Sequence, residues 1–146
     1  MGLLQVFSGE SAEPEKLRQG LGEQWAVNDV WVKVYPICGW IQGVVQLLLA
    51  LRGPRPLEEK RIKKVVVGTS QFAVRHNGST SPSDTMEAQY SIPYGVALAL
   101  TGNPGDPGAF SLDAIKDPVR RAIAQRVELR VDAESEAVYP RRFGSR

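Results

Sequence analysis

The sequence predicts an α+β domain in which helices pack on a mainly antiparallel sheet. Apolar residues recur at helical spacing in Gly39–Leu51 and form an unbroken run after Tyr94. Two short stretches, Arg61–Val67 and Arg126–Asp132, are rich in β-branched residues, and the second alternates apolar with charged side chains. Helices and strands are interleaved without the regular period of βαβ units, which favours an antiparallel sheet.

The first third of the chain is predicted to hold a short helix and an extended segment. Pro14 suits the first turn of a helix over Glu13–Gly20. Trp25–Tyr35 is expected to be extended, because valines alternate there with larger side chains. The alternation places Lys33 on one face with Trp31 and Tyr35. After it, the helix Gly39–Leu51 presents a set of apolar residues at core spacing: Ile41, Val44, Val45, Leu48 and Leu49.

A second helix is predicted to end at Gly102, and Pro93 leaves two possibilities for its start. Either Ser91 caps a new helix whose first turn contains Pro93, or one long helix from Thr85 is kinked there. In both cases free N–H groups and the positive end of a helix dipole collect beside Tyr94, which is a favourable place for a carboxylate. Farther on, residues 103–108 form a loop, Asp117 starts another helix, and Arg126–Asp132 is the last strand.

Composition excludes several classes of function. The chain has 146 residues, 42% hydrophobic and 23% charged, which is enough for one core, so we predict a single domain over residues 1–146. A net charge of +2 with dispersed basic residues argues against nucleic acid. The run Gly43–Leu51 is too short to cross a membrane, so no membrane contact and a cytoplasmic location are expected. A single cysteine and a single histidine exclude a disulfide, a metal cage and an iron–sulfur cluster. The sequence also has no nucleotide-binding glycine loop. We therefore expect no cofactor. His76, before an Asn-Gly turn signal, is interpreted as a loop or helix-end residue.

Two motifs in the same order resemble the MmgE/PrpD family. Residues 87–97, EAQYSIPYGVA, are similar to the family's EA-x-x-S-x-x-Y-x-x-A helix, and residues 33–38, KVYPIC, are similar to its K-x-Y-P-x-C turn. The resemblance implies the smaller α+β lid domain of proteins that also have an all-helical domain. We therefore expect a fragment that lacks the N-terminal helical domain and the extreme C-terminus, from a full-length protein that forms a homodimer.

The resemblance implies a lyase, a dehydratase or decarboxylase that acts on small di- or tricarboxylates such as 2-methylcitrate or cis-aconitate. Such enzymes move a proton at carbon beside a carboxylate. An epimerase of the same family uses the same proton transfer and remains an alternative. A second alternative, of another class, is a non-catalytic domain that binds a partner subunit or folds as a dimer through its apolar helices.

The candidate catalytic residues are Lys33 and Tyr94, whose family counterparts lie at the active site. Lys33 could hold a carboxylate or move a proton, and the alternative is a strand lysine that reaches solvent. Tyr94 could donate a proton, and the alternative is a core tyrosine. Candidate substrate-binding residues are Ser91, Cys38 and Gln42, although capping explains Ser91 and burial explains Cys38. Gln42 stands where the family often has a histidine, which leaves a hydrogen-bonding group without a base.

Overall fold

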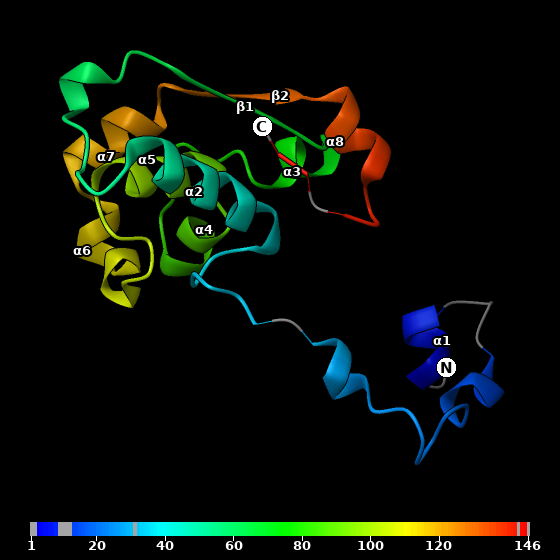
Figure 1. Ribbon diagram of the computed structural model, residues 1–146. Coiled ribbons are helices and arrows are strands. Elements are labelled where there is room, and N and C mark those ends of the chain that lie inside the picture. Colours follow the sequence, from blue (N-terminus) through cyan, green and yellow to red (C-terminus); the bar gives the residue numbers. More distant parts are fainter. Residues whose placement is uncertain (1–2, 9–12, 31, 143, 146) are drawn as a thin grey trace. The chain divides into compact units, whose positions relative to one another are not determined.

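A computed structural model describes residues 3–8, 13–30, 32–142 and 144–145 of this chain, and helices dominate it (Figure 1). Most of the helices are short, and several are single 3₁₀ turns. In chain order the elements are α1 (Leu3–Ser8), η2 (Pro14–Leu17), η3 (Ala26–Asp29), α2 (Gly39–Arg52), η4 (Glu59–Arg61), β1 (Val65–Thr69), α3 (Gln71–His76), α4 (Thr85–Gln89), α5 (Ile92–Thr101), η5 (Pro107–Phe110), α6 (Leu112–Ile115), α7 (Pro118–Ala124), β2 (Val127–Val131) and α8 (Ala133–Val138).

The chain divides into two compact units, residues 1–32 and 33–146. The first unit contains α1, η2 and η3, and none of its residues with a described burial is buried. The helix expected over Glu13–Gly20 is present only as the 3₁₀ turn Pro14–Leu17. The buried apolar core lies in the second unit, from Ile37 onward.

The prediction of an extended segment over Trp25–Tyr35 is wrong for the described residues of that segment. Ala26–Asp29 forms a 3₁₀ turn, and no strand occurs at the described positions that follow it. Val30, Val32 and Val34 are all exposed, so their alternation reflects no buried sheet face. Trp31, which was expected to share a face with Lys33, lies outside the described residues.

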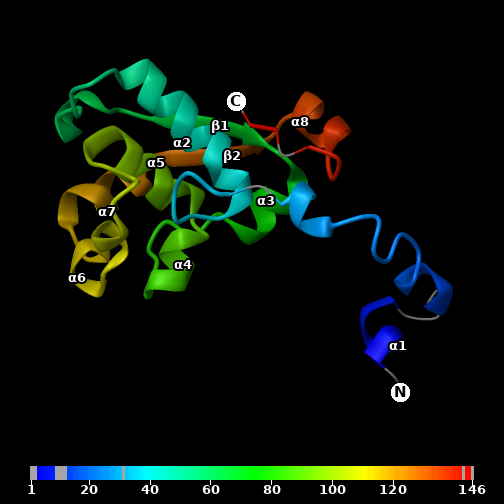
Figure 2. The same ribbon diagram turned by 60° about the horizontal axis from the view of Figure 1, so that its bottom comes forward.

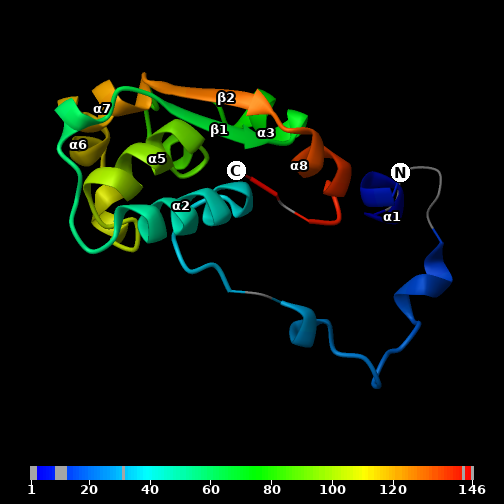
Figure 3. The same cartoon turned by 45° about the horizontal axis from the view of Figure 1, so that its top comes forward.

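Helix α5 is the centre of the second unit. Every residue from Ile92 to Leu100 is buried, which follows from a sequence that is apolar all round rather than along one stripe. Figure 3 shows α5 between the two strands and α2. Helix α2 packs its predicted apolar face there: Ile41, Val44 and Val45 are buried, and Leu48 and Leu49 pack against the core.

The prediction of a mainly antiparallel sheet is wrong. The sheet in the described residues has two strands, β1 and β2, which pair in parallel with Val65 opposite Val127 and Thr69 opposite Val131. Parallel neighbours need a long crossover connection, usually helical. Helices α3 to α7 supply it here, although they are too short and irregular to show a βαβ period in the sequence.

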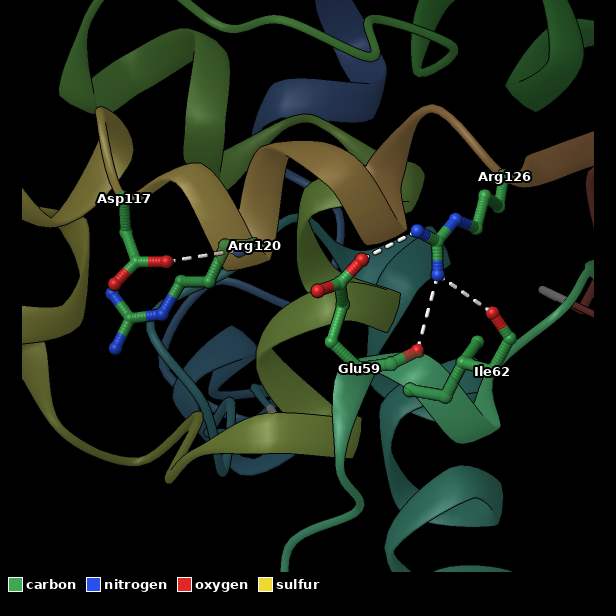
Figure 4. Close-up of polar contacts among 5 residues, drawn as sticks. All are labelled: Glu59, Ile62, Asp117, Arg120 and Arg126. Atoms are coloured by element: carbon green, nitrogen blue, oxygen red, sulfur yellow. Dashed lines mark hydrogen bonds and ion pairs between the residues drawn. The ribbon is translucent and has the colours of Figure 1, made fainter.

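Arg126 fixes the start of β2 against the segment that leads into β1 (Figure 4). Its guanidinium donates to the backbone carbonyls of Ile62, at 2.8 Å, and Glu59, at 3.1 Å, and pairs with the Glu59 carboxylate. Because the planar guanidinium donates in several directions at once, it can hold two carbonyls and a carboxylate together. This contact sets where the two strands begin side by side.

Serine and aspartate caps begin the helices of the second unit that follow β1. Each cap accepts a hydrogen bond from a backbone N–H of the first turn, which satisfies a donor that has no partner inside the helix. Asp117 begins α7 as predicted, by accepting from the Arg120 N–H at 2.9 Å. Figure 2 shows α6 and α7 at one end of this unit and α3 and α8 toward the other. The capping residues are Ser70, Asp84, Ser91, Ser111, Asp117 and Asp132.

Candidate functional site

An open pocket of about 520 Å³ lies in the second unit beside the start of α2. Its volume falls within the usual range of small-molecule sites, about 300–1,000 Å³. The walls come from the segment before α2, the end of α4 and the start of η5. The described lining residues are Lys33, Val34, Tyr35, Pro36, Ile37, Cys38, Gln89, Tyr90 and Pro107.

Lys33 is the charged group among these lining residues, and no aspartate or glutamate is among them. Its side chain is exposed and makes no ion pair with a described residue. An unneutralised ammonium beside neutral walls creates a positive potential that attracts anions. The pocket therefore fits an anionic ligand better than a cationic one.

The turn that carries Lys33 is held by two glutamines of α2. The Gln42 amide accepts from the Tyr35 N–H at 3.2 Å, and it donates to the carbonyls of Tyr35 at 2.8 Å and Ile37 at 3.1 Å. One helical turn later, Gln46 accepts from the Tyr35 hydroxyl at 2.7 Å. The polar atoms of Gln42 are thus occupied by the turn. Gln42 is not among the described lining residues, and it contacts the pocket wall through its hydrogen bonds to Tyr35 and Ile37.

Cys38 lies where the turn meets α2. It is the N-cap of this helix, and its side chain makes no capping hydrogen bond. It is buried, at 4% exposure, and its N–H donates to the Gln89 carbonyl at 2.8 Å, which joins the start of α2 to the end of α4. Because the N-cap lines the pocket, the partial positive charge of the α2 N-terminus adds to that of Lys33.

Ser91 begins α5, as the first of the two predicted alternatives requires. Its hydroxyl accepts from the Tyr94 N–H at 2.9 Å and donates to the Ser79 carbonyl. The residue is buried and is not among the described residues that line the pocket. Its hydroxyl is fully used in joining the α5 N-terminus to the preceding loop.

Tyr94 lies in the core of the second unit. Its side chain is 0% exposed, its ring packs 5.9 Å from that of Phe110, and its hydroxyl donates to the Ala109 carbonyl at 2.6 Å. Burial raises the pKa of the phenol above its ordinary value, and the nearby Arg120 opposes that rise. Of the five predicted site residues, the structure brings Lys33 and Cys38 together in the pocket and keeps Tyr94, Ser91 and Gln42 out of its lining.

Tyr90 lines the pocket and was not among the predicted site residues. It follows the last residue of α4 and precedes the Ser91 cap. A signal for it was present: a large side chain between two helix boundaries belongs to neither buried helix face, so it can point to the surface. The side chain is 49% exposed.

The described residues offer no metal site at this pocket or elsewhere, since no group of three or more His, Cys, Asp or Glu side chains lies together. His76 is exposed and packs against Phe72, with ring centroids 4.4 Å apart. No described helix has the length and apolar character needed to span a membrane.

The fold and pocket define a mostly helical domain with a small parallel sheet and an open site suited to an anion. The sequence model of the MmgE/PrpD C-terminal domain family matches residues 35–145, and the chain belongs to this family. The match includes Cys38, Gln42, Ser91 and Tyr94 and begins two positions after Lys33. A search of curated proteins gave no match.

Proposed function

We propose that this domain forms one wall of the active site of a lyase, a dehydratase or decarboxylase that acts on small di- or tricarboxylates. The observation that carries the proposal is the pocket in which Lys33 is the charged lining group and has no ion-pair partner among the described residues. The MmgE/PrpD domain supports it independently, because the family implies a lyase-type protein.

In this proposal Lys33 holds a substrate carboxylate at the mouth of the pocket. The exposed ammonium is a point charge on a flexible side chain, and the N-terminus of α2 at Cys38 adds a partial positive charge at a fixed position. Together they stabilise the negative charge that develops on a carboxylate when a proton leaves the adjacent carbon. The group that accepts this proton comes from another part of the full-length protein. Tyr94 as proton donor stays a prediction, and the Tyr94 hydroxyl would first have to leave the Ala109 carbonyl.

Binding of citrate to the isotope-labelled chain tests the carboxylate site. We expect citrate to shift the amide resonances of residues 33–35, 37–38 and 89–90. Lys33→Ala should weaken binding by roughly tenfold or more, as expected for a lost charged hydrogen bond. Lys63→Ala is the matched control, since Lys63 is an exposed lysine without a described ion pair that lines a different depression. Equal weakening by both variants would show non-specific charge attraction and contradict the site.

An epimerase of the same family uses the same proton transfer, and incubation of the full-length protein with candidate substrates in deuterated water separates the two. A lyase releases water or carbon dioxide, whereas an epimerase exchanges the α-proton and inverts the centre without loss of either.

Partner binding is a second candidate function, and a specific observation favours it. Large apolar side chains of the first unit are exposed, among them Phe7 at 82% and Trp25 at 63%. Contiguous exposed apolar surface commonly marks a protein interface. In this proposal the first unit binds another polypeptide. Association of the intact chain that is lost without residues 1–32, together with an absence of citrate binding at the pocket, would favour this function over the carboxylate site.

A further inference from the structure

Tyr90 lines the pocket with Lys33, and its hydroxyl is free of hydrogen bonds to the described residues. Of the four tyrosines in the chain, Tyr35 donates to Gln46 and Tyr94 donates to Ala109. Tyr139 packs in an aromatic group with Trp40 and Phe72. The Tyr90 hydroxyl has no hydrogen-bond partner among the described residues, and Tyr90 lies in the pocket wall with half of its surface exposed.

The backbone around Tyr90 is held from two directions. Its carbonyl accepts from the Asn77 side chain at 2.7 Å, and its N–H donates to the Met86 carbonyl at 3.0 Å. The preceding carbonyl, that of Gln89, accepts from the Cys38 N–H at 2.8 Å. Asn77 is itself buried, so this corner is anchored in the core. A phenol on a fixed backbone donates from a reproducible position, which lowers the entropy lost when a ligand binds.

Tyr90 lines two depressions whose charged groups have opposite signs. The pocket contains Lys33, and a second, mostly apolar depression contains Asp84 and Glu87 beside Met86. The carboxylates repel an anion from the second depression, whereas the ammonium attracts it to the pocket. An anionic ligand in contact with Tyr90 is therefore favoured in the pocket of Lys33.

We propose that Tyr90 is a substrate-contacting residue whose hydroxyl donates a hydrogen bond to a second carboxylate of a ligand held by Lys33. The inference rests on the proposed carboxylate site and names the residue of this chain that contacts the second acidic group of the ligand. One ammonium recognises a single carboxylate, whereas an ammonium and a phenol on separate elements of one pocket fit a di- or tricarboxylate. A hydrogen bond to an ionised acceptor is among the stronger ones, so the phenol contributes to affinity as well as orientation.

Citrate binding to the intact chain tests this assignment through Tyr90→Phe, which removes one oxygen and keeps the ring. We expect the dissociation constant for citrate to rise roughly tenfold, the change that corresponds to one hydrogen bond to a charged group. Tyr139→Phe removes a phenol hydroxyl at the aromatic group of Trp40 and Phe72, and it should leave the constant unchanged. Amide spectra of both variants without citrate show whether the fold is retained.

The outcomes separate the inference from the function on which it rests. If citrate binds, Lys33→Ala weakens it and Tyr90→Phe does not, the role of Tyr90 is overturned and the carboxylate site stands. If citrate shifts no pocket amide in the unaltered chain, both are overturned. Loss of affinity in Tyr90→Phe with an unchanged free spectrum and an unaffected Tyr139→Phe supports the inference.

Discussion

At the scale of single residues, the contact between α2 and α5 depends on the absence of a side chain at Gly95. A Cβ added there would lie 2.8 Å from Ile41 Cγ2 and 3.6 Å from Val45 Cγ2. Both neighbours are fully buried and β-branched, so they have little rotamer freedom with which to move aside. The glycine therefore sets how closely the two helices approach.

We predict that Gly95→Ala lowers the free energy of unfolding by about 1–3 kcal/mol, the usual cost of overpacking a core. Denaturant unfolding measures the change. Gly43→Ala is the matched control in α2, because nothing lies within 4 Å of its added Cβ and the position is exposed. The control should be more stable than the unaltered chain by about 0.5–1 kcal/mol, since alanine favours a helix. An unchanged or raised stability in Gly95→Ala would show that the helices can separate freely.

Residue roles were predictable where they depend on near neighbours in the chain. The Ser91 cap follows from a serine, a proline two positions later and an apolar run, all within one turn. The partner of the Tyr94 hydroxyl, Ala109, lies beyond the next loop, and no local pattern indicates it. The hydrogen bond from the Tyr35 N–H to the Gln42 side chain likewise depends on how a turn folds back on a helix.

At the scale of elements, Glu87 of α4 organises the loop before it. Its carboxylate accepts from the Ser79 hydroxyl at 2.7 Å and from the N–H and hydroxyl of Ser83 at 2.8 and 2.9 Å. The Ser79 hydroxyl, followed by the two Ser83 donors, lowers the pKa of Glu87 below its ordinary value of 4.5. The composition of residues 78–83, rich in glycine and serine, is typical of a mobile segment, whereas this carboxylate ties it to α4.

We predict a pH-dependent effect of Glu87→Gln. Because the folded pKa is depressed, the ionised carboxylate stabilises the fold fully above about pH 4.5, and this stabilisation is lost as the pH falls through the folded pKa. Thermal unfolding should show a lower midpoint for the variant at pH 7 and a smaller difference from the unaltered chain at pH 3. Glu23→Gln, at an exposed carboxylate without a described hydrogen bond, should leave the midpoint little changed at both pH values. A difference for Glu87→Gln that is constant with pH would contradict the role of the charge.

Helices and strands were predictable where the residues that determine them lie close together in the sequence. The helix Gly39–Arg52 and the start of α7 follow from apolar periodicity and a cap within a few residues. The direction of strand pairing depends on residues 65–69 meeting residues 127–131 across a helical crossover. Nothing in either strand specifies that direction. Alternation in residues 30–35 was misleading because an exposed segment can alternate without a partner strand.

At the scale of the whole molecule, the described core draws on the second unit. The buried apolar cluster begins at Ile37 and includes no described residue of 1–32. Several apolar side chains of the first unit are exposed instead, as those of Phe7 and Trp25 are. Association of the intact chain that is lost in a chain of residues 33–146 would support partner binding through the first unit.

We predict that residues 33–146 fold by themselves with the unfolding midpoint of the intact chain, because no described residue of 1–32 belongs to the buried core and the large losses of stability come from changes in a core. Thermal unfolding at a concentration where both are monomeric is the measurement. A chain of residues 39–146 is the control, since its truncation also removes the buried Ile37 and Cys38 and the bond from the Cys38 N–H to Gln89. Its midpoint should fall by several degrees, as expected from losing about 2–4 kcal/mol of core packing and hydrogen bonding. A lower midpoint for residues 33–146 would mean that the first unit stabilises the second, and the division of the chain at Lys33 would not hold.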